Sequence, residues 1–250
     1  MFIKNLLRYK VKTLNCALLR RIRMEEAKDS FRAAIIGGSG AVGREIIQLL
    51  DEDDNFSKVT IITRRRIDEW NKLKNVEKFE FLDVESLDEL LTMDKDLFRS
   101  YDTFFCTLGS RTKYGKEIFF KVDYTYPLQF CEFAKSCGVP HYSVLSASGG
   151  KPKSWFYYFK VKGLMEEAVK NVGMEMVSIF KPGLITQRRN DSRFVEKIGK
   201  VIPFVSKCSA IRIAQTMILD AEIFHKVKRK FNVQNGCRVF QNKEIKKPNF

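Results

Sequence analysis

The sequence has few histidines and no paired cysteine motif. Its two histidines and six cysteines include no Cys-x-x-Cys pair and no metal-ligand spacing, so we expect no metal site and a reducing intracellular compartment. No apolar run reaches the roughly 18 to 20 residues of a membrane-spanning helix, which argues against an integral membrane protein.

Acidic residues are nearly absent from both ends of the chain. Residues 1–24 carry seven Lys/Arg and no acid, and residues 226–250 carry eight Lys/Arg and one acid. Between these ends, 30 Lys/Arg stand against 29 Asp/Glu. The net charge of +15 therefore belongs to the ends, and we expect no direct binding of nucleic acid.

Residues 1–30 are interpreted as a basic N-terminal extension. Basic and apolar residues without a carboxylate are typical of mitochondrial targeting segments. If this segment is helical, its leucines would form one apolar face, which could lie peripherally on an anionic membrane. These leucines are Leu6, Leu7, Leu14, Leu18 and Leu19. A disordered tail, or a leader before a second start at Met24, stays open as an alternative.

From about residue 31, short apolar strands alternate with helices. The expected strands are 33–37, 59–63, 78–82, 103–106, 142–145 and 176–180, and the expected helices are 41–50, 119–137 and 155–172. This alternation predicts one α/β domain with a Rossmann-like, doubly wound parallel sheet. We assign it to residues 31–225, with a small substrate-side segment at 183–209 and a basic C-terminal segment at 226–250.

A glycine loop follows the first strand and opens the first helix. Gly37-x-x-Gly40-x-x-Gly43 permits a tight turn, lets Gly40 approach a pyrophosphate and lets Gly43 pack against the strand. The helix N-terminus supplies N–H donors for the anion. This context favours a dinucleotide site over a structural turn.

The end of the second strand indicates which dinucleotide is bound. An NAD site usually has Asp or Glu there, whereas this chain reads Thr63 followed by Arg64, Arg65 and Arg66. Guanidinium groups bind a 2′-phosphate through charge-assisted pairs. The sequence therefore predicts NADP(H), held by Arg64 and Arg65, while Arg66 points to water; a solvated basic turn is the alternative.

A serine, a tyrosine and a lysine form the candidate catalytic group. Ser146 ends a strand, and Tyr158 and Lys162 are four residues apart, on one face of a helix. A cation beside a phenol favours the phenolate, so Tyr158 can exchange a proton with a substrate oxygen while a serine hydroxyl orients that oxygen. Ser148 remains an alternative to Ser146. Cys106 has no positive neighbour in the sequence, so it is interpreted as structural.

Together these motifs resemble atypical short-chain dehydrogenases/reductases, specifically the Tat-interacting-protein-like oxidoreductase family, over roughly residues 32–225. The similar segments are NFSKVTIITRRR (55–66), CTLGSRTK (106–113), FKVDYTYPLQFCEFAKSCG (120–138), YFKVKG (158–163), FKPGLI (180–185) and RNDSR (189–193). The asparagine often found in the dehydrogenase proton relay has no clear match, and Asp123 stands near its place.

The resemblance implies further contacts to the cofactor. Phosphates would be cradled by Ser39, Gly40, Ala41 and Val42; adenine would lie near Asp83 and Val84. The ribose and nicotinamide side would be lined by Leu108, Gly109 and Lys162, the carboxamide end would meet backbone up to Ile185, and Arg193 would close over the cofactor.

The sequence thus predicts an NADP(H)-dependent oxidoreductase acting on an unidentified carbonyl or alcohol, with Tyr158 as proton donor or acceptor. The alternative is an NADP(H)-sensing regulatory adaptor with little catalysis, which would bind a regulatory protein partner. The resemblance and the termini leave the cytoplasm, the nuclear envelope and mitochondria open as locations, and a monomer or homodimer as the assembly.

Overall fold

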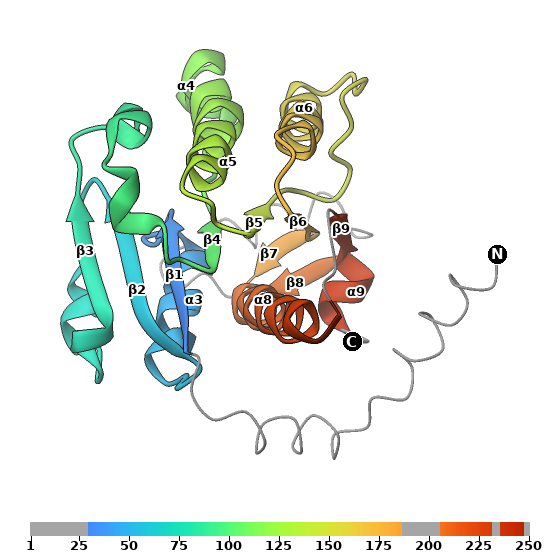
Figure 1. Ribbon diagram of the computed structural model, residues 1–250. Coiled ribbons are helices and arrows are strands. Elements are labelled where there is room, and N and C mark those ends of the chain that lie inside the picture. The colour runs from blue at the N-terminus through green and yellow to red at the C-terminus, as the bar shows by residue number, and fades with distance from the viewer. Residues whose placement is uncertain (1–29, 187–205, 232–235, 248–250) are drawn as a thin grey trace.

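A parallel β-sheet forms the centre of the molecule. The computed structural model describes residues 30–186, 206–231 and 236–247. In this part of the chain, the seven strands of the main sheet lie in the order β3-β2-β1-β4-β5-β6-β9, and β7 pairs separately with β8 (Figure 1). Every pairing is parallel. The predicted Rossmann-like, doubly wound sheet is therefore confirmed.

The strands of the main sheet are β1 (Phe31–Ile36), β2 (Phe56–Thr63), β3 (Phe79–Asp83), β4 (Thr103–Cys106), β5 (His141–Leu145), β6 (Met176–Lys181) and β9 (Gly236–Gln241). The separate pair is β7 (Leu184–Thr186) and β8 (Lys207–Ser209). The strands β4, β5 and β6 are buried along their whole length, as expected for parallel strands with both faces covered.

The α-helices are α3 (Ala41–Asp51), α4 (Lys116–Phe120), α5 (Tyr126–Ser136), α6 (Tyr157–Asn171), α8 (Ala210–Phe231) and α9 (Asn242–Lys246). Short 3₁₀ turns span Asp68–Lys72, Val76–Lys78, Leu87–Thr92, Lys95–Phe98 and Thr112–Tyr114. The predicted helix 119–137 is interrupted by a π-helical turn at Lys121–Thr125, which joins α4 to α5.

Two apolar cores lie on opposite faces of the sheet. One contains Phe104, Phe130 and Met165, from β4, α5 and α6. The other contains Ile46 and Met217, from α3 and α8. Figure 1 shows α5 and α6 on one side of the sheet and α3 and α8 on the other. This layering leaves the carboxyl ends of β1, β4 and β5 open between the helices, where α/β sheets bind ligands.

The C-terminal part of the chain contributes to the same sheet. The strand β9 pairs with β6 from Met176↔Gly236 to Lys181↔Gln241, and α8 continues past residue 225 to Phe231. The boundary expected at 225 therefore divides a helix and leaves out the seventh strand. The strand β9 was not predicted, because this region is basic and the residues of the strand are at most partly buried.

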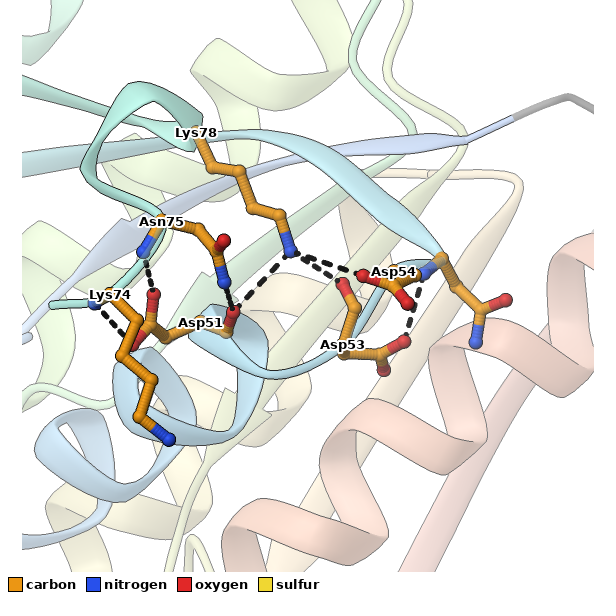
Figure 2. Close-up of polar contacts among 7 residues, drawn as sticks. Asp51, Asp53, Asp54, Lys74, Asn75 and Lys78 are labelled. Carbon is orange, nitrogen blue, oxygen red and sulfur yellow. Dashed lines mark hydrogen bonds and ion pairs between the residues drawn. The ribbon is translucent and has the colours of Figure 1, made fainter.

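A buried acid and a lysine fasten the end of α3 to the segment between β2 and β3 (Figure 2). Asp51 accepts hydrogen bonds from the backbone N–H groups of Lys74 and Asn75, at 2.9 and 2.8 Å. The Lys78 ammonium donates to the carbonyl of Asp53 at 3.1 Å. Carbonyls at a helix C-terminus lack partners within the helix, so these contacts stabilise both segments.

No helix in the described part of the chain is long and apolar enough to cross a membrane. Among the described residues, no group of three or more His, Cys, Asp or Glu side chains is arranged to hold a metal ion.

Candidate cofactor and active site

The glycine loop has the geometry that a dinucleotide site requires. Gly37 has φ +82°, and a Cβ there would lie 2.7 Å from the Thr107 backbone. A Cβ on Gly43 would lie 2.3 Å from the Gly37 carbonyl. Gly40 is the N-cap of α3, and a Cβ there would lie 3.2 Å from the Gly37 carbonyl oxygen, which is a tight contact. Gly37 and Gly43 thus let strand, loop and helix pack closely, while Gly40 leaves room beside the helix N-terminus.

A cleft of about 380 Å³ opens over this loop. Its lining includes predicted residues from both halves of the sheet: Ser39, Gly40, Ala41, Val42, Leu108, Gly109, Ser146, Tyr158, Lys162 and Ile185. The lining also includes Arg44, Thr107, Ser110, Arg111 and Asp123, to which the sequence analysis assigned no cofactor contact. The two halves of the sheet therefore converge on one cleft at the switch in strand order.

A second cavity, of about 460 Å³, adjoins the cleft and shares Ser39 and Leu108 with it. Arg64 and Arg65 lie in its lining, and both residues are exposed. The Thr63 hydroxyl donates to the Arg65 carbonyl at 2.8 Å, which orders the turn that carries the two arginines. A long ligand with an anionic end can therefore run from the cleft across the glycine loop to these guanidinium groups.

Arg66 is exposed to solvent, as expected, but its guanidinium also has partners in the protein. Its guanidinium binds the Asp83 carboxylate, with Nη2 to Oδ2 at 2.7 Å and Nε to Oδ2 at 3.0 Å. It also lies 4.8 Å from the centre of the Phe81 ring. Arg66 is thus occupied by its neighbours on β3, whereas Arg64 and Arg65 line the cavity.

Asp83 and Val84, expected beside the adenine, line neither of the two cavities. Asp83 is paired with Arg66, and Val84 is buried in the core. The cavity wall is formed one to three residues later in the chain, by Glu85 and Leu87. Val84 is buried in the core, so the part of the segment after β3 that faces the cavity is Glu85 and Leu87.

Ser146 and Ser148 occupy different environments. β5 ends at Leu145, and Ser146 is buried in the wall of the cleft. Its hydroxyl donates to Glu166 Oε1 at 2.5 Å, while Glu166 Oε2 pairs with the Lys181 ammonium at 2.6 Å. Ser148 is exposed and does not belong to the lining of either cavity. Of the two serines, the structure brings only Ser146 beside Tyr158 and Lys162.

Lys162 is held by a buried carboxylate. Its ammonium lies 2.8 Å from Asp123 Oδ1, and both side chains are almost fully buried. Asp123 Oδ2 accepts the Ser110 backbone N–H at 2.8 Å. Burial lowers the pKa of Lys162, but the charge of Asp123 and the nearby Tyr158 phenol outweigh it, so the pKa is raised. Lys162 is therefore charged at neutral pH.

The position of Asp123 follows from the π-helical turn. The turn inserts an extra residue into the run from α4 to α5, and Asp123 within it is fully buried at the cleft. Sequence reasoning noted Asp123 near the place of the relay asparagine but assigned it no contact. Its place beside Lys162 could not be read from helical periodicity, because the π turn changes the phase of the helix.

Cys106 is buried beside the cleft, and burial raises the pKa of its thiol to about 11. This supports its interpretation as a structural residue. Arg193 lies outside the described residues.

Comparison with known proteins defines the class. The profile of the family described as "Semialdehyde dehydrogenase, NAD binding domain" matches residues 32–118. Among solved structures, MoeE5 in complex with UDP-glucose and NAD has a TM-score of 0.64 at 11% identity, covering 84% of this chain and 75% of that one. The enzyme WbmH of Bordetella bronchiseptica, in complex with NAD⁺, has a TM-score of 0.59 at 14% identity, covering 78% and 73%. The chain therefore has the Rossmann-like fold of these NAD-bound proteins, and residues 32–118 resemble an NAD-binding domain.

Curated relatives define the family. The protein HTATIP2 of Rattus norvegicus is 34% identical over 176 residues, which cover 70% of this chain and 71% of that protein. The protein FMP52-1 of Scheffersomyces stipitis, named as mitochondrial, is 29% identical over 164 residues, covering 64% and 70%. The chain belongs to the HTATIP2 and FMP52 family of atypical short-chain dehydrogenase/reductase proteins, as the sequence motifs predicted.

Proposed function

We propose that the protein is an NADP(H)-dependent oxidoreductase that interconverts a carbonyl compound and an alcohol. The observation that carries the proposal is the convergence of Ser146, Tyr158 and Lys162 on one cleft, which continues past the glycine loop to Arg64 and Arg65. When bound, the nicotinamide supplies or accepts the hydride.

Residues of the chain would transfer the proton, orient the substrate and bind the cofactor. Tyr158 would donate a proton to the substrate oxygen, or take one from it. The Lys162 charge favours the phenolate form that this exchange produces. Ser146 would orient the substrate oxygen, and the N–H groups at the start of α3 would bind the pyrophosphate.

Preference for NADP(H) would arise at the arginine turn. Arg64 and Arg65 can bind a 2′-phosphate in charge-assisted pairs, which contribute about 1.5 to 3 kcal/mol each. Glu85 lies in the same cavity lining, and its carboxylate is suited to a ribose hydroxyl rather than a phosphate. Two guanidinium groups against this one carboxylate leave the cavity net positive, which favours the phosphorylated cofactor.

The test is a fluorescence titration of the purified protein with NADPH and with NADH. Arg64→Ala/Arg65→Ala should weaken NADPH binding by about a hundredfold and leave NADH binding nearly unchanged. Arg66→Ala is the matched control, because Arg66 is paired with Asp83, and its NADPH affinity should stay within about threefold. Equal binding of both nucleotides by the wild type would refute the NADP(H) preference, and absence of binding would refute the function.

Two buried carboxylates favour a second candidate, an NADP(H)-sensing adaptor with little turnover. The Glu166 carboxylate accepts the hydrogen bond of the Ser146 hydroxyl, and Asp123 balances the Lys162 charge. The Ser146 hydroxyl is therefore less available to hydrogen-bond a substrate oxygen, and the Lys162 charge is partly neutralised. Tight NADPH binding without NADPH oxidation across a panel of aldehydes, ketones and quinones would support the adaptor over the enzyme.

A further inference from the structure

The loop between β5 and α6 presents two aromatic side chains to solvent. Trp155 is fully exposed and Phe156 is 73% exposed. Exposed aromatic residues of this size are uncommon on a surface without a partner. In Figure 1 this loop and the start of α4 lie at the same end of the molecule.

Backbone hydrogen bonds and close packing against α6 fix the conformation of this loop. The Ser154 N–H donates to the Lys151 carbonyl at 3.0 Å, and the Lys151 N–H donates to the Phe159 carbonyl at 3.0 Å. Gly163 lets α6 approach the loop, since a Cβ there would lie 2.2 Å from the Lys151 backbone. The aromatic pair is therefore displayed by a fixed backbone.

Exposed lysines lie around Trp155. Lys153 and Lys160 line a hollow together with Trp155, and Lys116 reaches the same hollow from the start of α4. The Tyr157 hydroxyl donates to the Lys116 carbonyl at 3.1 Å, which ties the two segments together. From residue 146 to residue 165 the chain carries no Asp or Glu, so no carboxylate of this segment offsets the lysines.

We propose that Trp155, Phe156, Lys116, Lys153 and Lys160 form a docking surface for an anionic lipid bilayer. Tryptophan prefers the depth of the headgroups, and lysines attract anionic lipids while their apolar stems lie along the surface. Protein interfaces are depleted in lysine. A symmetric second copy would bring like charges together, so charge complementarity selects the bilayer.

The docking surface adjoins the cleft. Tyr157 belongs to the hollow beside Trp155, and the next residue, Tyr158, lines the cleft. A bilayer bound here would lie beside the site of the proposed reaction. The inference does not depend on that reaction, because it rests on exposure, charge and loop geometry alone.

The two tryptophans provide a direct test, because Trp70 is buried and only Trp155 is exposed. Trp70→Phe leaves Trp155 as the sole reporter, and Trp155→Phe leaves Trp70 as the internal control. With phosphatidylcholine vesicles that contain phosphatidylserine, Trp155 emission should shift to shorter wavelength and be quenched by lipids brominated in their acyl chains. Trp70 should show neither change. If Trp70→Phe does not fold, the wild type read against Trp155→Phe gives the same comparison.

Substitutions then test each component by vesicle co-sedimentation of the full chain. Trp155→Ala/Phe156→Ala should weaken binding at least about tenfold, and Lys153→Glu/Lys160→Glu should weaken it about fivefold or more for each charge lost. Val76→Ala/Leu97→Ala, which truncates two exposed apolar side chains elsewhere, is the matched control and should bind as the wild type does.

Three results would overturn the proposal. The first is absence of binding to the anionic vesicles. The second is co-sedimentation without any change in Trp155 emission, which would assign binding to another part of the chain. The third is self-association in sedimentation velocity that Trp155→Ala/Phe156→Ala abolishes, which would identify a second copy as the occupant.

Discussion

At the scale of single residues, Asp123 determines the charge balance of the cleft. Its carboxylate is 2.8 Å from the Lys162 ammonium and also accepts the Ser110 N–H. Taking a lysine out of water disfavours its charged form, and a nearby opposite charge restores it. The site therefore contains a buried ion pair where a dehydrogenase relay often has a neutral amide.

Asp123→Asn should lower the pKa of Lys162, because the raising charge is lost while burial remains. The asparagine oxygen can still accept the Ser110 N–H, so the backbone contact is preserved. The measurement is the pH dependence of the ¹³C shift of the Lys162 side chain, assigned by comparison with Lys162→Arg. An unchanged titration would show that Asp123 does not control this lysine.

The sequence was informative about single residues where type and spacing decide the chemistry. Ser146, Tyr158 and Lys162 lie together in the cleft, as their order along the chain predicted. The sequence could not show which of the three consecutive arginines has a partner in the protein, because Asp83 lies beside Arg66 only through the pairing of β2 with β3. Asp123 was equally inaccessible, since its contact depends on the π-helical turn.

At the scale of elements, α8 and the end of α3 meet through a pair of carboxyl groups. Burial and the neighbouring Asp53 carboxylate raise the pKa of Glu222, on α8, to about 7. Glu222 Oε1 accepts the Asn55 side-chain N–H at 2.9 Å. Glu222 therefore keeps its proton to a higher pH in the folded protein than in the unfolded chain.

Stability should accordingly fall as pH rises from about 4.5, the ordinary pKa of the group, through about 7. Glu222→Gln keeps an acceptor for Asn55 and removes the titration. We expect it to be about 2 kcal/mol more stable than the wild type at pH 8 and nearly equal at pH 5, by urea denaturation. A constant difference across this range would refute the role of Glu222.

The elements differ in how visible they are in the sequence. Buried strands such as β4 and β6 are short, continuous apolar runs, and their length and composition identify them. The helix α8 carried a usable signal, since Ala210, Ile213, Ala214, Met217 and Ala221 are buried at helical spacing. The strand β9 did not, because its alternation is weak and its residues are at most partly buried. Only pairing with β6 gives it a strand conformation.

At the scale of the whole molecule, Asn242 links three separate parts of the chain. Its side-chain oxygen accepts the Gly183 N–H at 2.7 Å, and its side-chain nitrogen donates to the Ser206 hydroxyl at 2.6 Å. Gly183 precedes β7, Ser206 precedes β8, and Asn242 begins α9. Because Ile185 on β7 lines the cleft, the C-terminal elements support the cofactor site from behind.

Asn242→Ala should destabilise the protein by about 1 to 3 kcal/mol, since the partly buried Gly183 N–H loses its acceptor. NADPH binding should weaken as well, because β7 loses its attachment. Lys243→Ala, at the exposed neighbouring position, should leave both properties unchanged. Chemical denaturation and NADPH titration of both variants are the measurements. If Asn242→Ala is as stable as the wild type but binds NADPH more weakly, Asn242 affects only the cofactor site and not the stability of the fold.

The two histidines of the chain both lie inside the molecule, where the Thr103 hydroxyl oxygen is 3.2 Å from His141 Nδ1 and 2.7 Å from His225 Nε2. Burial lowers the pKa of His141, and no imidazole contributes to the surface. The exterior charge is therefore carried by lysines, arginines and carboxylates, whose ordinary pKa values are far from neutral. Attraction to anionic surfaces should respond to ionic strength and lipid composition while staying nearly constant between mildly acidic and neutral pH.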